Sequence, residues 1–165
     1  MAEPSFHPLN TSWTLWGHLP HDIEWTIKSY QCIHTVAYVE QVIALLYTLP
    51  EKLITNCMLF FIREGIKPIW EDKANKSGGC FSYKIPNTQV PSLWYDVCCA
   101  VAGESLSEDK IFNKAVVGVT ISPKKNFCIL KIWMTNCDHQ NPAKIVGVKN
   151  LKQQGCLFKK HQPEY

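Results

Sequence analysis

The stretch VVGVTISPKKNFCILKIW, residues 116–133, is typical of a β-hairpin. Two runs rich in Val and Ile flank the segment PKKN at 123–126, whose residues favour a turn. Other strand-like runs stand before and after it: SWTLWGHL (12–19), CMLFFIRE (57–64), CFSYKI (80–85) and CLFKK (156–160). Strands joined mainly by short turns pair antiparallel, so these runs predict an antiparallel sheet.

Three segments have the spacing of helices. Residues 35–50, TVAYVEQVIALLYTLP, carry apolar residues on one helical face and end at Pro50. Residues 91–104, PSLWYDVCCAVAGE, place Ser92 where a cap would lie, and residues 141–155, NPAKIVGVKNLKQQG, begin at Asn141 and end at Gly155. Helices inserted singly between strands pack on one face of a sheet, so we predict an α+β fold.

Length and composition indicate one domain, 1–165, with a short flexible leader at 1–6 and a short tail at 161–165. A net charge of +3 does not require nucleic acid, yet it allows a local basic patch. The chain has no run of 18 apolar residues, and its start, MAEPSFHPLN, lacks the apolar stretch of a signal peptide. We expect no membrane association and a cytoplasmic location, with room for a nuclear fraction.

The eight cysteines are scattered and form no C-x-x-C pair. In a reducing compartment they fit small buried hydrophobes better than disulfides. The CDH triplet at 137–139 is too tight for usual zinc spacing, so neither a metal nor a cofactor is expected. A Cys–His nucleophile, and hence a hydrolase, stays a distant alternative because no local motif places such a pair.

The six tryptophans fall into two groups. Those at 13, 16 and 94 lie in apolar periodic segments and fit a core. Trp25, Trp70 and Trp133 lie in loops or at a strand end beside polar residues, which makes them poor core candidates. Two loop indoles can hold a flat ring between them, and Glu71 beside Trp70 could accept two hydrogen bonds from its edge. A guanine methylated at N7 is flat, cationic and offers two such donors, so it would add cation–π attraction. The alternative is that all six tryptophans pack in the hydrophobic core.

The segments HPLNTSWTLW, GIKPIWEDKANKSGG, LWYDVCCAVAGES and IWMTN resemble, in order and spacing, the sequence blocks of the translation initiation factor 4E family of mRNA cap-binding proteins. The resemblance covers about residues 7–155. It implies a curved antiparallel sheet with about three helices on its convex face and a cap-binding cleft on the concave side. It also implies that Trp25 and Trp70 stack on 7-methylguanine, that Glu71 takes its N1 and N2 donors, and that Trp133 packs beside the N7 methyl group.

The positions that would bind the triphosphate depart from the family pattern. The family has an arginine where this chain has Thr120, and a bracing aspartate where it has Met58. Lys131 should share a strand face with Trp133 and could substitute for the missing cation. The remaining basic candidates, on the hairpin turn, are Lys124 and Lys125, for which a solvated hairpin tip is an equally good interpretation.

The surface that would bind a partner is also altered. In the family, a helical peptide of a scaffold factor or of a repressor docks on the convex side. Val39 fits that pattern, whereas Ile43 replaces an expected tryptophan. The other residues that the resemblance places there are His7, Pro8, Leu9, Tyr95, Asp96, Cys99 and Gly103. Binding of the usual scaffold peptide is therefore open.

The sequence thus predicts a monomeric, non-enzymatic protein that binds the 7-methylguanosine triphosphate cap of mRNA and recruits it to translation through a scaffold partner. The alternative is a cap-binding repressor, or a virus-encoded or specialised relative with an altered partner surface.

Overall fold

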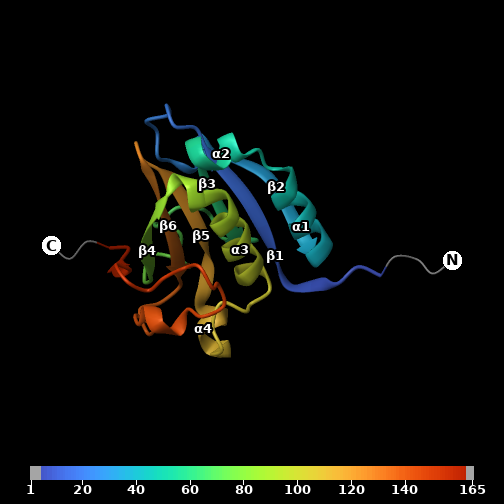
Figure 1. The fold of residues 1–165 in the computed structure, drawn as a ribbon, viewed down its shortest axis with the longest axis vertical. Helices are drawn as coiled ribbons and strands as arrows, with labels where there is room; N and C mark the ends of the chain where they lie inside the picture. The colour runs from blue at the N-terminus through green and yellow to red at the C-terminus, as the bar shows by residue number, and fades with distance from the viewer. Residues whose placement is uncertain (1–4, 163–165) are drawn as a thin grey trace.

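A computed structural model describes residues 5–162 and places seven antiparallel strands in one sheet (Figure 1). The spatial order is β2-β1-β3-β5-β6-β4-β7. Their bounds are β1 Pro8–His18, β2 Tyr30–Tyr38, β3 Met58–Arg63, β4 Gly79–Pro86, β5 Val116–Pro123, β6 Phe127–Met134 and β7 Leu157–Lys160. Residues 1–4 and 163–165, the outer parts of the expected leader and tail, lie outside the described residues.

The predicted hairpin is present as β5 and β6. Lys124 N–H donates to the carbonyl of Phe127 at 2.8 Å and closes the turn. Gly118 lies where β5 pairs with β3, opposite Ile62, and a Cβ atom there would approach the Phe61 carbonyl oxygen to 2.4 Å. A side chain at this position would therefore force β3 and β5 apart.

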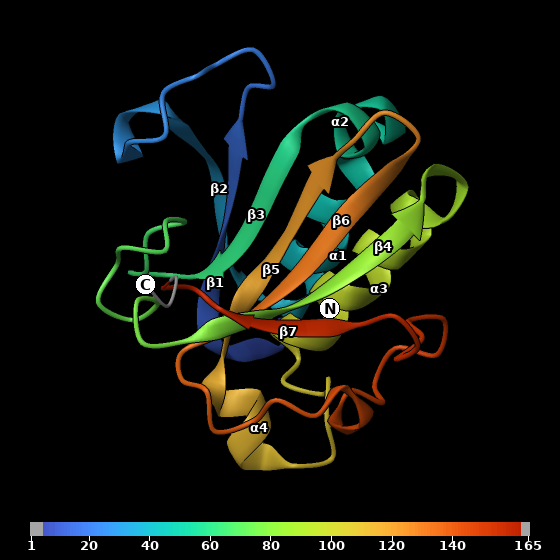
Figure 2. The ribbon, with the colours of Figure 1, turned by 90° about the vertical axis from the view of Figure 1, so that its left-hand side faces the viewer.

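Helices cover one face of the sheet (Figures 1 and 2). Their bounds are α1 Val39–Thr48, α2 Glu51–Asn56, α3 Val90–Ala102 and α4 Lys110–Ala115, with single 3-10 turns at Ile27–Ser29, Asn87–Gln89 and Pro142–Lys144. Helices α1 and α2 both contact α3, which in turn lies on β1 and β5. The predicted fold class, an antiparallel α+β sheet with helices on its convex face, is confirmed.

The apolar side chains form two cores. The larger one fills the space between the sheet and the helices and includes Trp13, Phe61 and Trp94, which are almost completely buried. The smaller one, which we call the concave-face cluster, lies on the opposite face of the sheet and consists of Phe60, Ile62, Cys80, Val117 and Trp133. Alternation along the strands separates the two sets, because successive side chains point to opposite faces.

The predicted helix at 141–155 is wrong. Only the turn Pro142–Lys144 is helical, although Asn141 does cap it by accepting from the Ala143 N–H at 3.0 Å. Beyond it the backbone packs on the α3–α4 connection, where Val146 and Gly147 both donate to the carbonyl of Leu106. These tertiary hydrogen bonds replace helical ones.

The other helix boundaries also shift. Residues 35–38, expected in the first helix, belong to β2, an edge strand whose side chains are mostly exposed and so lack a clear alternating pattern. Ser92 lies inside α3, whose cap position is Gln89. Helices α2 and α4 are short elements that the apolar pattern did not predict. No helix in the described part of the chain is long and apolar enough to span a membrane.

Candidate functional site

A cavity of about 450 Å³ opens on the concave face of the sheet. It brings together five of the residues predicted from the sequence: Trp25, Trp70, Glu71, Lys131 and Trp133. They come from the loop after β1, the loop between β3 and β4, and strand β6. Residues separated by more than a hundred positions therefore face one space.

Trp25 is held by a stacked histidine. The imidazole of His18 lies parallel to the indole, with centroids 4.2 Å apart and an interplanar angle of 1°. His18 itself is buried and fixed on both sides, its Nδ1 lying 3.0 Å from the Leu19 carbonyl and its Nε2 lying 2.8 Å from the Glu24 carbonyl. Because one face of the indole is covered while the side chain is 54% exposed, the other face is available to a flat ligand.

The loop that carries Trp70 and Glu71 is ordered by two polar residues of the same motif. The Asp72 carboxylate accepts from the backbone N–H groups of Lys67 (3.0 Å) and Ala74 (2.9 Å). Asn75 is fully buried and donates to the carbonyls of Lys67 and Ile69 at 3.1 and 2.8 Å. These bonds tie both ends of the segment before Trp70 to the turn after Glu71.

Gly78 completes the loop. A Cβ atom there would come within 1.7 Å of the Met134 carbonyl oxygen, so only glycine lets the chain approach β6 so closely. The WED, Asn and double-Gly pattern is thus a structural frame that presents one indole and one carboxylate.

Glu71 is exposed, and its negative charge affects the titration of the nearby Tyr30 phenol. Burial of the phenol raises the pKa of Tyr30 to about 12, and the negative charge of Glu71 is a second, smaller cause of the increase. Tyr30 therefore remains protonated at neutral pH. Its ring packs edge-on against Phe60, with centroids 5.2 Å apart, so it joins the cavity wall to the concave-face cluster.

Trp133 is more buried than the sequence indicated. Only 8% of it is exposed, and it belongs to the concave-face cluster while also lining the cavity. Its Nε1–H donates to the Oγ1 of Thr120 at 3.3 Å. The expectation that Trp133 is a poor core candidate is therefore wrong. Thr120, where the sequence resemblance implies an arginine, is itself 3% exposed and accepts a hydrogen bond from the Trp133 indole.

The three lysines predicted to bind phosphate lie in two different places in the structure. Lys131 lies opposite Ser82 on β4 and Thr120 on β5, and it lines the cavity. Lys124 and Lys125 lie at the hairpin turn and are not among the residues that line it.

Among the lysines and histidines that line the cavity, three were not predicted as site residues: Lys159, Lys160 and His161. Strand β7 brings them to the site by pairing with the first half of β4. The two adjacent lysines in the predicted strand CLFKK were the available signal, but the pairing partner of that strand was unknown. His161, expected in a short tail, packs on Trp133 with centroids 4.8 Å apart. Burial, and then the positive charge of Lys131, lower the pKa of His161 to about 4.

The residues predicted to bind a partner gather on the helical side. His7 bonds to the Glu40 carboxylate at 2.6 Å and accepts through its carbonyl from Val39 N–H at 2.9 Å, so the segment before β1 is fixed to the start of α1. Val39 and Ile43 are each 39% exposed. The rings of Tyr47 on α1 and Tyr95 on α3 meet edge-on, 5.2 Å apart.

The other members of this set lie close by. Pro8 and Leu9 begin β1, Asp96 and Cys99 lie on α3, and Gly103 caps that helix by donating to the Cys99 carbonyl at 3.0 Å. Five exposed apolar residues lie on α1 or in the segments before β1 and at the end of β2. We call them the α1 patch: Phe6, Tyr38, Val39, Ile43 and Tyr47.

The adjacent cysteines of α3, Cys98 and Cys99, have environments that disfavour a nucleophile. Burial raises the pKa of the Cys98 thiol well above its usual range and also raises that of Cys99, which disfavours the reactive thiolate. Among the described residues, no group of three His, Cys, Asp or Glu side chains is placed to hold a metal ion.

Comparison with known proteins gives a consistent result. A family model described as eukaryotic initiation factor 4E matches residues 8–163. The chain is 32% identical over 149 residues to eukaryotic translation initiation factor 4E of Eremothecium gossypii, covering 87% of this chain and 69% of that protein. It is 30% identical over 155 residues to the Saccharomyces cerevisiae protein of the same name, covering 87% and 68%.

Solved structures share the fold. A schistosome eIF4E, in complex with m7GpppG and 4E-BP, superposes with a TM-score of 0.74 at 22% identity, covering 82% of this chain and 76% of that one. Caenorhabditis elegans eIF4E-3, in complex with the 4E-binding protein Mextli and a cap analogue, gives 0.72 at 21% identity, covering 81% and 76%.

Proposed function

Because the chain belongs to the eukaryotic initiation factor 4E family, we propose that it binds the 7-methylguanosine cap of messenger RNA and acts in translation initiation. The family consists of binding proteins, so the chain is not an enzyme. The single observation that carries the proposal is the cavity in which Trp25, Trp70 and Glu71 meet beside Trp133.

The geometry suits a flat cationic base. Trp25 has one covered and one open face, and Trp70 is 40% exposed on the same cavity. Stacking of a base on an aromatic side chain contributes about 1–3 kcal/mol. The positive charge that N7 methylation gives guanine adds a cation–π term of roughly 0.5–2 kcal/mol. The two indoles therefore favour a methylated over an unmethylated guanine.

The carboxylate supplies base specificity. Glu71 can accept from the N1–H and N2–H of guanine, and hydrogen bonds to a charged group contribute about 1.5–3 kcal/mol each. Adenine lacks both donors on that edge. The Glu71 side chain is exposed, so part of this gain is offset by removing the carboxylate from water.

The triphosphate would lie along the side of the cavity that carries the lysines. Lys131 comes from β6, and Lys159 and Lys160 come from β7, so the positive charges lie on the wall beside Trp133. Lysines act on phosphate as flexible point charges and not as a rigid fork. We therefore assign the phosphate contribution to these three lysines, with a strong dependence on salt.

The helical side is proposed as the partner surface. The α1 patch leaves five large apolar side chains exposed beside α3, and an amphipathic helix binds such a surface through its own apolar face. Solved relatives of this fold are in complex with 4E-binding proteins. We propose that a helical peptide of a scaffold initiation factor docks here and recruits the bound message.

Retention on an immobilised 7-methylguanosine triphosphate resin tests the cap proposal. The protein should be retained and should elute with free 7-methylguanosine triphosphate, whereas unmethylated guanosine triphosphate should elute it far less well. Intrinsic tryptophan fluorescence should fall during titration with the soluble cap, because the indoles stack on the base. Equal elution by the two nucleotides would contradict the cation–π account.

A further inference from the structure

The four strands β5, β6, β4 and β7 are neighbours in the sheet, and their sequences contain no Asp or Glu (Figure 2). The segments VVGVTISP, FCILKIWM, GCFSYKIP and LFKK carry lysines instead: Lys84, Lys131, Lys159 and Lys160. The turn between β5 and β6 adds Lys124 and Lys125. This part of the sheet is therefore strongly basic, although the net charge of the whole chain is only +3.

Strand β6 joins the cap cavity to the hairpin turn along one face of the sheet. Lys131 and Trp133 line the cavity. Because every second residue of a strand points to the same face, Ile129 and Phe127 follow Lys131 on the concave face. Both are partly exposed, and Phe127 lies about 20 Å from Trp133 along the strand. The concave surface thus continues beyond the cavity towards the turn.

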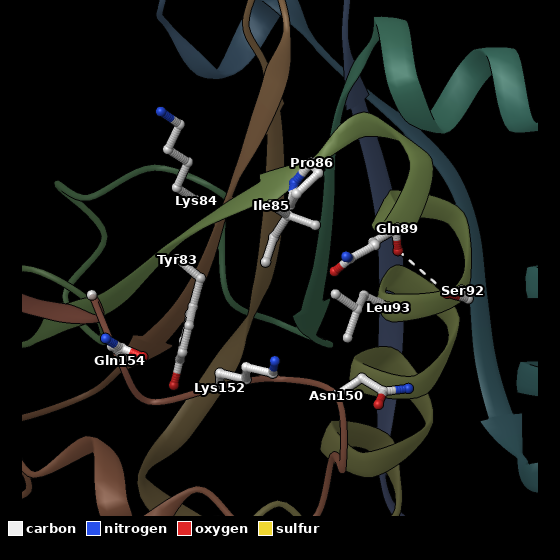
Figure 3. Close-up of a pocket in the computed structure, with 11 residues that line it drawn as sticks. Tyr83, Lys84, Ile85, Pro86, Gln89, Ser92, Leu93, Asn150, Lys152 and Gln154 are labelled. Carbon is white, nitrogen blue, oxygen red and sulfur yellow. Dashed lines mark hydrogen bonds between the residues drawn. The ribbon is translucent and has the colours of Figure 1, made fainter.

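Lys84 and Phe127 form a pair on this surface. Lys84 points to the opposite side of β4 from Tyr83 and Ile85, whose side chains line a cavity on the helical side (Figure 3). Lys84 is exposed, and its ammonium lies 4.4 Å from the centre of the Phe127 ring, within the range of a cation–π contact. Lys124, whose N–H donates to the Phe127 carbonyl at 2.8 Å, adds a second cation beside the same residue.

An aromatic ring among lysines suits a single-stranded nucleic acid. Bases of any identity stack on an aromatic face, and cations attract the phosphates that link them. In the proposed function the triphosphate of the cap lies beside Lys131, so the RNA attached to it starts at the border of this surface. An acidic protein segment would meet the same lysines but has no such point of entry. Continuity with the cap cavity therefore favours RNA.

We propose that the RNA next to the cap runs along this surface and stacks one of its first bases on Phe127, while its phosphates lie beside Lys84 and Lys124. We call these three residues the Phe127 subsite. The inference rests on the proposed cap binding and extends it to the RNA chain. The Lys84 ammonium is carried on a flexible stem, so it can move from the ring to a phosphate while the backbone of β4 stays in place.

The test compares three ligands by calorimetric titration: 7-methylguanosine triphosphate, the same cap followed by three adenosines, and the same cap followed by three abasic nucleotides. The adenosine ligand should bind the wild type about tenfold more tightly than 7-methylguanosine triphosphate does. The abasic ligand should lose most of this gain, because it has phosphates but no bases. Phe127→Leu, which keeps an apolar side chain without a ring, should also lose most of the gain, whereas Phe127→Tyr should retain it.

The lysine of the subsite has a matched control on the other side of β4. Lys84→Ala should lower the gain from the adenosines and make the slope of log affinity against log salt concentration shallower by about 0.7. Lys152→Ala removes the same charge from a side chain that points into the cavity on the helical side (Figure 3). It should leave both the gain and the slope at their wild-type values.

An NMR titration of the nitrogen-15-labelled chain with uncapped 5′-triphosphate triadenylate separates this inference from cap binding. The amide signals of Lys84 and Phe127 should shift with this RNA. Shifts without retention on the cap resin would support the subsite and overturn the cap proposal alone. Retention without shifts, equal binding of the adenosine and abasic ligands, or equal effects of Lys84→Ala and Lys152→Ala would overturn the subsite. Tighter binding of an oligoglutamate peptide than of the RNA at these signals would identify an acidic protein as the occupant and overturn RNA.

Discussion

The imidazole of His18 and the indole of Trp25 lie 4.2 Å apart and within 1° of parallel. This stack holds the indole of Trp25 in place, although the loop after β1 that carries it is mostly exposed. Aromatic pairs contribute about 0.5–1.5 kcal/mol beyond the area they bury. We therefore expect His18→Ala to weaken cap binding roughly 3–10-fold, measured by fluorescence titration, while His18→Phe, which keeps a flat ring, retains most of it. Equal loss in both variants would show that the imidazole's hydrogen bonds, and not its stacking, hold Trp25.

Glu71→Ala should weaken binding of the 7-methylguanosine nucleoside by about 10–100-fold, since it removes hydrogen bonds to a charged acceptor. Glu71→Gln should also bind poorly, because its amide presents only one accepting oxygen. Calorimetric titration of each variant provides the measurement, and Glu108→Ala, at an exposed position far along the chain, is the control. Wild-type affinity in both Glu71 variants would mean that the carboxylate does not contact the base.

Lys131→Ala should lower affinity for 7-methylguanosine triphosphate while hardly changing affinity for the nucleoside. The side chain lines the cavity beside Trp133, and its attraction to phosphate is screened by salt. Titrations at low and high salt should show the difference between wild type and variant shrinking as salt rises. Lys125→Ala, which removes the same charge from the hairpin turn, should have a smaller effect. Equal loss of nucleoside and triphosphate binding would assign Lys131 a packing role.

Thr120→Val should destabilise the fold by about 1–3 kcal/mol, because the buried Trp133 N–H loses its acceptor. Thr120→Ser keeps the hydroxyl and should cost less. Thr120→Arg, which introduces the arginine that the sequence resemblance implies at this position, should not improve triphosphate binding, since Thr120 is 3% exposed and a larger side chain there would overpack its surroundings. Urea unfolding and cap titration of the three variants check this, and tighter binding by the arginine variant would contradict it.

His161 predicts a pH dependence of stability. Its pKa in the folded protein is about 4, below the usual value of about 6.5 for an unfolded chain. Between these two values the unfolded state binds more protons, so stability falls as the pH drops from about 6.5 to about 4. After a discount for solvent screening, the loss attributable to His161 is about 1–2 kcal/mol.

Urea unfolding at pH 7 and pH 4.5 measures this dependence. His161→Gln should show a smaller loss of stability between the two pH values than the wild type. His21→Gln, at an exposed position, should show the same loss as the wild type. An unchanged dependence in His161→Gln would mean that other groups govern acid sensitivity.

Some of this protein could be predicted from its sequence because the signals are local. The hairpin of β5 and β6 has a turn flanked by β-branched runs, and α3 has a long apolar face. The motif around Trp70 carries its own frame in Asp72 and Asn75, whose hydrogen bonds lie within the same short segment. These elements depend on neighbours in the chain, so the sequence alone specifies them.

Other features depend on partners that are distant in the sequence. The apolar residues at 145, 148 and 151 are spaced as in a helix, yet hydrogen bonds to Leu106 hold that segment in another conformation. Lys159, Lys160 and His161 reach the cavity only because β7 pairs with β4.

The role of Thr120 also depends on strand register. Thr120 on β5 pairs with Lys131 on β6, and its hydroxyl accepts a hydrogen bond from the indole of Trp133, two residues after Lys131. The sequence determined which residues can stack on, pair with and accept from a base. Tertiary structure decided which cations join them, because Lys159 and Lys160 reach the cavity only through a strand pairing that leaves no local signal.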